Sequence, residues 1–221
     1  CPVSNKDFYT NKNEGISLDL YTKLLEDLDK IKYKGTILFS AFSEPLLNKN
    51  LKKIISITKS ILPDIHLEIN SNGDVIKKNV NKLLGLYESG LDTMVISVYD
   101  GIKEYKMFER MQNENNLTNN QFVVRRRYYD EDKKDYGIIF SNRSGTVNVK
   151  RFINQDDSIE ETMPLRRVCY YPFYQAMVDY NGDVLLCPHD WAKKYIIGNI
   201  KESSILDLWI NKKSQSAKKM L

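Results

Sequence analysis

Histidine and cysteine are scarce in this chain, and their scarcity restricts the chemistry that it can carry. The 221 residues include only 2 histidines and 3 cysteines. Neither His66 nor His189 lies beside a nucleophile motif, so a Ser–His–Asp hydrolase site has little support. The widely spaced cysteines give no dense disulfide framework, which favours a reducing, cytoplasmic location.

Several other signatures are missing as well. The sequence has neither a Gly-x-Gly-x-x-Gly turn nor a Walker-type loop, so dinucleotide and P-loop sites are not indicated. No run reaches the ~18 apolar residues of a membrane helix, and no signal-peptide pattern opens the chain. Lys and Arg number 33 against 29 Asp and Glu, an excess too small to indicate a nucleic-acid surface. We therefore expect no membrane partner and no nucleic-acid partner.

Hydrophobic periodicity predicts an α/β fold with a parallel sheet. Predicted strands begin near positions 36, 66, 92 and 121, which are 26 to 30 residues apart, and helices lie between the early ones. An open or closed barrel fits this rhythm better than an antiparallel sandwich. The expected helices cover residues 17–30, 51–61, 75–88 and 103–113, and the expected strands cover 36–42, 66–70, 92–98, 121–129 and 137–141.

The C-terminal part has a different character. An acidic, irregular stretch at 156–164 indicates a connector between residues 1–155 and 165–221, which we predict to be separate domains. Alternating residues around Asn181-Gly182 predict a β-hairpin over 175–186. A short helix is expected over 203–211, with Leu206 and Trp209 pointing inward.

Polar residues follow the predicted strands, which is where parallel α/β folds place their working groups. After the first of these strands come Ser43, Glu44 and Pro45. Because Pro45 fixes the local backbone, Glu44 is expected to face the open mouth of the sheet, where a carboxylate suits an ammonium group. The same residues also fit an ordinary helix N-terminus, so this segment alone leaves both interpretations open.

Three such segments, in this order, resemble the motifs of radical S-adenosylmethionine enzymes. Glu44-Pro45 resembles the end of a Gly-Gly-Glu-Pro motif in which Phe42 and Ser43 replace the glycines. The segment from Asn70 to Gly73 resembles the Thr-Asn-Gly turn, and the segment from Ser97 to Gly101 resembles the Ser-x-Asp-Gly segment with one extra residue. The resemblance implies a partial (β/α)6 TIM-like barrel.

The resemblance also implies roles in binding S-adenosylmethionine. Ser43 and Glu44 would bind the amino group of its methionine part, and Arg110 would bind the carboxylate. Ribose or carboxylate contacts would come from Asn70, Asn72 and Ser97.

Cys1 acquires a meaning from the same resemblance. The family signature is Cys-x-x-x-Cys-x-x-Cys after the first strand, and Cys1 fits only as its third member because Asn5 and Phe8 occupy the later positions. We therefore expect a first strand and two cysteines upstream of Cys1, which would be a ligand of a [4Fe–4S] cluster. A fortuitous terminal cysteine is the alternative.

The other two cysteines, Cys169 and Cys187, flank the predicted hairpin. Twelve residues separate Cys169 from Gly182 and four separate Gly182 from Cys187, a spacing similar to the opening of a SPASM or twitch extension. The resemblance implies an auxiliary iron–sulfur cluster bound by both thiolates, in an extension that continues beyond Leu221. A zinc site with His189 and two buried structural thiols remain alternatives.

As a whole, the resemblance implies an oxidoreductase or isomerase that cleaves S-adenosylmethionine reductively. The resulting 5′-deoxyadenosyl radical would abstract hydrogen from a sugar-like or nucleotide-sugar substrate, with flavodoxin or ferredoxin as electron donor. Peptide or protein maturation is one alternative, and a cluster-free or zinc-binding module without enzymatic activity is another. Arg125 and Arg127 share a face of their predicted strand and Arg126 faces the other way. The candidate substrate residues are Arg125, Arg127, Asn142, Arg143, His189 and Asp190.

Overall fold

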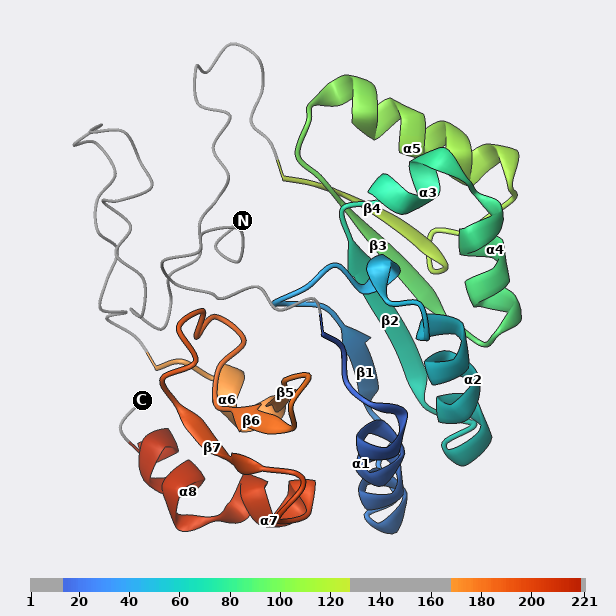
Figure 1. The fold of residues 1–221 in the computed structure, drawn as a ribbon. Helices are drawn as coiled ribbons and strands as arrows, with labels where there is room; N and C mark the ends of the chain where they lie inside the picture. The colour runs from blue at the N-terminus through green and yellow to red at the C-terminus, as the bar shows by residue number, and fades with distance from the viewer. Residues whose placement is uncertain (1–13, 128–167, 220–221) are drawn as a thin grey trace, which may run out of the picture. The chain divides into compact units, whose positions relative to one another are not determined.

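The computed structural model describes residues 14–127 and 168–219 (Figure 1). The chain forms two compact units. One unit is continuous and comprises residues 32–139, whereas the other combines residues 1–31 with residues 140–221. Among the described residues, no helix has the length and apolar character needed to cross a membrane.

The continuous unit is built on a four-stranded parallel sheet in the order β1-β2-β3-β4. Its strands are β1 (Thr36–Phe39), β2 (His66–Ser71), β3 (Thr93–Val98) and β4 (Phe122–Arg126). This confirms the predicted parallel α/β sheet, although β1 and β4 end earlier than expected. The predicted strand at 137–141 lies outside the described residues.

Helices connect the strands of this sheet. They are α2 (Leu51–Ile61), α3 (Asp74–Lys78), α4 (Asn81–Glu88) and α5 (Ile102–Glu114), preceded by the 3-10 helix η2 (Pro45–Leu47). Figure 1 shows α2, α4 and α5 on the same side of the sheet, as right-handed crossovers between neighbouring parallel strands require.

The sheet therefore has two different faces. Side chains that alternate along each strand bury one face under the helices; this helix-covered face includes Leu67, Ile69, Met94, Ile96 and Phe122. Phe108 of α5 packs there against Phe122, with ring centroids 6.3 Å apart. Burial of each such aromatic side chain stabilises the fold by about 1.5–3 kcal/mol. The opposite, polar face carries His66, Glu68, Asn70, Thr93, Ser97 and Arg125.

The prediction of a single helix over 75–88 is wrong, because the structure contains two helices, α3 and α4, in its place. The break lies at Asn79, whose backbone is extended with φ −159°. The side-chain oxygen of Asn79 accepts the backbone N–H of Asn81 at 3.0 Å. Asparagine favours such local bonds over the helical pattern, and hydrophobic spacing alone does not reveal them.

The discontinuous unit combines α1 (Leu18–Lys30) with a small antiparallel sheet. The sheet contains β5 (Met177–Val178), β6 (Asp183–Leu185) and β7 (Ile196–Asn199). The pairing of β5 with β6 confirms the predicted hairpin, and Gly182 adopts φ +93° in its turn. Strand β7 was not predicted. The remaining helices are α6 (Tyr171–Tyr174), α7 (Ile205–Ile210) and α8 (Lys212–Lys219).

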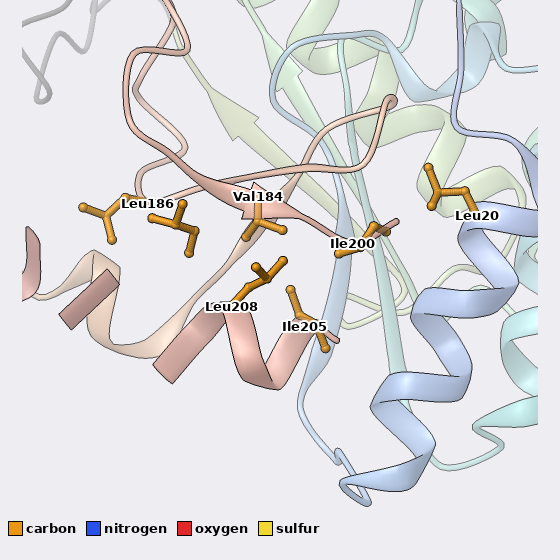
Figure 2. Close-up of a cluster of buried hydrophobic side chains, with 7 residues drawn as sticks. Leu20, Val184, Leu186, Ile200, Ile205 and Leu208 are labelled. Atoms are coloured by element: carbon orange, nitrogen blue, oxygen red, sulfur yellow. The ribbon is translucent and has the colours of Figure 1, made fainter. Parts of the chain in front are cut away.

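A hydrophobic cluster forms the core of this unit. It joins Leu20 of α1 to side chains of the small sheet and of α7: Val184, Leu186, Ile197, Ile200, Ile205 and Leu208. Figure 2 shows Leu186, Val184, Leu208 and Ile205 gathered between β6 and α7.

The predicted inward position of Leu206 is wrong. Its side chain is 41% exposed, whereas Ile205 and Leu208 are buried. Ser204 caps α7 by accepting the N–H of Asp207, and this start places Ile205 and Leu208 on the same helix face.

Candidate functional site

Glu44 connects the carboxyl ends of β1 and β2. Its Oε1 accepts the backbone N–H of Leu46 at 3.1 Å and the hydroxyl of Ser71 at 2.7 Å. Its Oε2 accepts the backbone N–H of Asn72 at 3.0 Å. The carboxylate therefore fixes the loop after β1 to the turn after β2.

This bonding leaves Glu44 able to receive one more donor. A carboxylate has about four acceptor positions, and three are filled here, so one remains on Oε2. An ammonium group supplies both the proton and the positive charge that suit this position. The residues thus fit the amino group of S-adenosylmethionine.

Ser71 is a component of this site that the sequence analysis missed. It is only 3% exposed, and its oxygen accepts the backbone N–H of Gly73 at 2.9 Å while its hydroxyl donates to Glu44. Gly73 takes φ +80°, a conformation that suits glycine. Alternation places Ser71 on the helix-covered face, where an apolar residue is usual, and that mismatch is the signal that could have revealed it.

The side chain of Asn72 is engaged locally. Its Oδ1 accepts the N–H of Asp74 at 3.0 Å and its Nδ2 donates to the carboxylate of Asp74 at 2.9 Å. These bonds form an Asx turn at the start of α3. Asn72 also donates its backbone N–H to Glu44. All of these contacts hold the shape of the turn after β2.

Lys77 joins the two helices that follow β2 and β3. Its Nζ contacts Asp74 at 2.8 Å and also pairs with Glu104 of α5. Burial alone would lower the pKa of Lys77, but the two carboxylates raise it above its ordinary value. Its charge is therefore retained, and it stabilises the arrangement of α3 and α5.

Asn70 and Ser97 meet on the polar face. The hydroxyl of Ser97 donates to Oδ1 of Asn70 at 3.0 Å, across β2 and β3. Ser97 is also the register partner of Arg125 on β4. Because register partners in a sheet point to the same side, the structure places all three residues on one face.

Three other predicted residues have exposed side chains. Arg110 is eight residues into α5, about 12 Å along the helix from its start, and its exposed side chain donates to the carbonyl of Lys106. Ser43 is exposed beside Glu44. Arg127 follows β4 and is exposed, and its backbone N–H donates to Val98 at 2.8 Å. The structure does not bring Arg110 to the group around Glu44.

Cys187 lies in a loop after β6. Its Sγ accepts the backbone N–H of His189 at 3.4 Å, and Nδ1 of His189 lies 4.0 Å from the same sulfur. The imidazole is edge-on to Tyr171 and Trp191, with centroid distances of 5.7 and 6.4 Å. N–H groups directed at cysteine sulfur are typical of iron–sulfur ligands. Cys187 therefore fits such a role.

Asp190 closes the same loop. It is fully buried, and its Oδ2 accepts the backbone N–H of Tyr195 at 2.7 Å. Its Oδ1 has no hydrogen-bond partner within residues 14–127 and 168–219. A substrate role for Asp190 stays a prediction, and its described contacts hold the loop that carries Cys187.

The metal-ligand prediction is only partly covered by the structure. Cys1, Asn142 and Arg143 lie outside the described residues. Cys169 and Cys187 are half-buried and free of disulfides. In the part of the chain that the structure describes, no three His, Cys, Asp or Glu side chains gather as a metal site.

Comparisons with known proteins identify the family. Residues 169–220 match the SPASM family, described as an iron–sulfur cluster-binding domain. The chain is 30% identical over 202 residues to the S-adenosyl-L-methionine-dependent 2-deoxy-scyllo-inosamine dehydrogenase of Niallia circulans, covering 91% of this chain and 73% of that protein.

Two solved structures are similar as well. The crystal structure of BtrN in complex with AdoMet and 2-DOIA has a TM-score of 0.71 and 28% identity, covering 93% of this chain and 74% of that one. Selenomethionine BtrN in an open conformation has a TM-score of 0.64 and 25% identity, covering 93% and 73%.

The chain belongs to the radical S-adenosylmethionine enzymes with a SPASM-type extension. It is an enzyme whose cofactors are S-adenosylmethionine and [4Fe–4S] iron–sulfur centres, as the sequence motifs predicted. The alternative of a cluster-free or zinc-binding module is thereby set aside.

Proposed function

We propose that this enzyme oxidises an alcohol carbon of a small sugar-like polyol, in particular an aminocyclitol. The observation that carries the proposal is the 30% identity to a 2-deoxy-scyllo-inosamine dehydrogenase along 91% of this chain. The similarity to BtrN bound to AdoMet and 2-DOIA supports the same substrate class. Small-molecule dehydrogenation is therefore preferred over nucleotide-sugar or peptide substrates.

The proposed fold and domains follow the same relationship. The four parallel strands would belong to a partial (β/α)6 TIM-like barrel formed mainly by residues 1–155, and residues 165–221 would form the cluster-binding extension. The polar face of the sheet, with Asn70, Ser97 and Arg125, would then line the interior of the barrel.

The residues around Glu44 would hold S-adenosylmethionine. The free acceptor position on Oε2 of Glu44 would bind its ammonium group, and Asn70 with Ser97 would bind ribose or carboxylate oxygens. When bound near a reduced [4Fe–4S] cluster, this cofactor supplies the 5′-deoxyadenosyl group that takes a hydrogen atom from the substrate. The protein contributes position and exclusion of water.

The extension would contribute a second cluster. Cys169 and Cys187 are proposed as two of its thiolate ligands, with the N–H of His189 directed at the sulfur of Cys187. Hydrogen bonds to cluster sulfurs raise reduction potentials, so this loop would tune the cluster as an electron acceptor. Arg125, Arg127 and His189 remain candidates for substrate contact, and flavodoxin or ferredoxin remains the candidate electron donor.

A labelling experiment tests the proposed function. The full-length protein, reconstituted anaerobically with iron and sulfide, is incubated with S-adenosylmethionine, a reductant and 2-deoxy-scyllo-inosamine deuterated at its alcohol carbons. We expect a ketone and 5′-deoxyadenosine in equal amounts, with deuterium in the latter.

Two results would contradict the proposal. One is 5′-deoxyadenosine that forms at the same rate with and without the cyclitol and carries no deuterium. The other is deuterium transfer from a labelled peptide substrate and none from the cyclitol, which would point to peptide maturation.

A further inference from the structure

The polar face of the sheet contains two pairs of side chains that bond across strands. His66 Nε2 lies 3.2 Å from the hydroxyl of Thr93, which also donates to the carbonyl of Asn120 at 2.8 Å. Four residues further along each strand, the side-chain amide oxygen of Asn70 accepts the hydroxyl of Ser97. Each of these polar groups therefore has a partner within the sheet.

Glu68 lies between the two pairs and, in the described part of the chain, has no bonding partner. It occupies the position between His66 and Asn70 on the same face of β2, in register with Leu38 on one side and Thr93 on the other. Its side chain is half-buried. Within residues 14–127 and 168–219, its carboxylate makes no hydrogen bond or ion pair. A partly buried carboxylate without a partner carries a desolvation cost, so a ligand that satisfies it would be favoured.

Arg125 is too distant to neutralise Glu68 within the sheet. Thr93 is the register partner of Glu68, and Ser97, four residues later, is that of Arg125. The two charged residues are thus two strands and four residues apart, or about 16 Å between Cα atoms at ordinary sheet spacings. Side chains at that separation do not form an ion pair, so among the described residues the polar face keeps an unpaired carboxylate.

Glu44 and Glu68 also occupy separate places. Glu44 binds Ser71, the last residue of β2, from the loop after β1. Glu68 lies three residues before Ser71, about 10 Å along the strand, and alternation places it on the face opposite to Ser71. Two carboxylates at two positions can serve two different ammonium groups.

We infer that Glu68 binds the ammonium group of the substrate and thereby selects an amino-substituted polyol. The inference rests on the proposed function, which assigns the cofactor's own ammonium to Glu44. A charge-assisted hydrogen bond to a half-buried carboxylate discriminates strongly between an ammonium and a hydroxyl group. Glu68 is a specificity-determining residue that the motifs of the sequence did not indicate.

The test compares Glu68→Gln with the unaltered full-length enzyme. The probes are 2-deoxy-scyllo-inosamine and the same cyclitol with a hydroxyl in place of the amine. For the amine, we expect the substitution to raise KM and the calorimetric Kd by about 10- to 100-fold, the usual worth of a hydrogen bond to a charged group, with kcat within about threefold. For the hydroxyl analogue, Kd should change by less than about threefold, since no charge is lost.

Control variants separate the effect of charge from that of folding. Glu88→Gln makes the same chemical change at an exposed position on α4 and should leave every constant unaltered. Glu68→Asp keeps the charge and should recover part of the lost affinity. Should Glu68→Gln fail to fold, the unaltered enzyme still decides, because it must bind the amine at least about tenfold more tightly than the hydroxyl analogue.

The outcomes also distinguish this inference from the proposed function. Unchanged amine affinity in Glu68→Gln, with normal oxidation by the unaltered enzyme, would overturn the role of Glu68 and leave the dehydrogenase intact. A higher Kd for S-adenosylmethionine in Glu68→Gln, with an unchanged Kd for the amine, would reassign Glu68 to the cofactor. Failure of the unaltered enzyme to oxidise either cyclitol would contradict the proposed function itself.

Discussion

At the scale of single residues, Glu44 is bonded in a way that makes it part of the scaffold as well as a candidate ligand. Its carboxylate accepts three hydrogen bonds that join the ends of β1 and β2. The Glu-Pro motif was readable from the sequence, because Pro45 follows a predicted strand. The partners of Glu44 were not, because Ser71 lies 27 residues away and is brought close only by strand pairing.

Replacing Glu44 should therefore affect the binding of S-adenosylmethionine. Glu44→Ala removes the acceptor for the cofactor's ammonium, and we expect it to weaken S-adenosylmethionine binding by at least about tenfold in anaerobic calorimetry. Iron content should stay unchanged. Full affinity in the variant would remove Glu44 from the cofactor site.

Ser71→Ala tests the scaffold part of this arrangement. It leaves Oε1 of Glu44 without one donor and the N–H of Gly73 without its acceptor, so the free energy of unfolding should fall by about 1–3 kcal/mol. Urea denaturation measures this loss. Ser56→Ala, at an exposed position on α2, is the matched control and should change stability by less than about 0.5 kcal/mol.

At the scale of elements, the helices with strong periodicity were predicted together with their ends, whereas the ends of strands β1 and β4 were not. α1, α2 and α5 matched to within one residue at each end. The break at Asn79 and the strand β7 were missed, since each depends on local bonds or on pairing with a partner strand. Strand β7 is short and contains Gly198, which interrupts the hydrophobic alternation.

The charge pattern of α1 gives a prediction on pH. Asp27 is buried and contacts Lys23 at 3.1 Å and Lys30 at 3.2 Å. Burial alone would raise its pKa, but the hydrogen bonds and charges of the two lysines lower it below 3.8. A lowered folded-state pKa means that the stabilisation is complete above the unfolded value and is lost as pH falls through the folded one.

Asp27→Asn should reveal this dependence. In urea unfolding, the variant should be less stable than the unaltered protein by about 1 kcal/mol or less at pH 7, because both lysines are partly exposed. The difference should shrink as the pH falls below about 4. A difference that stays constant from pH 7 to pH 3 would show that Asp27 contributes through packing.

At the scale of the whole molecule, the order of the motifs was more informative than any one of them. Asn72-Gly73 alone is an ordinary turn, and Cys169 and Cys187 alone fit zinc as well as iron. Together with Glu44 they predicted the radical S-adenosylmethionine class, which the comparisons confirm. The resemblance also predicted a sugar-like substrate, which the similarity to a 2-deoxy-scyllo-inosamine dehydrogenase supports. The amino group proposed for that substrate was beyond the sequence, because its recognition depends on which side chains share the polar face.

The proposed ligands of the second cluster can be tested by measuring iron in the whole protein. Replacing Cys169 and Cys187 together by alanine should lower the iron content of the reconstituted protein by about one cluster, or about four irons per chain. Reductive cleavage of S-adenosylmethionine should continue, because it depends on the first cluster. Equal iron in the double variant and the unaltered protein would contradict the assignment of both ligands.

The packing of Leu20 against Val184 and Leu208 has a consequence for biosynthesis. On the ribosome, Leu20 of α1 cannot reach its partner Leu208 until about 190 further residues have been translated. The sheet between these two segments is continuous in sequence and can fold first, as amino-terminal units generally do. A chain stalled before residue 184 would therefore leave Leu20 without this core and available to chaperones.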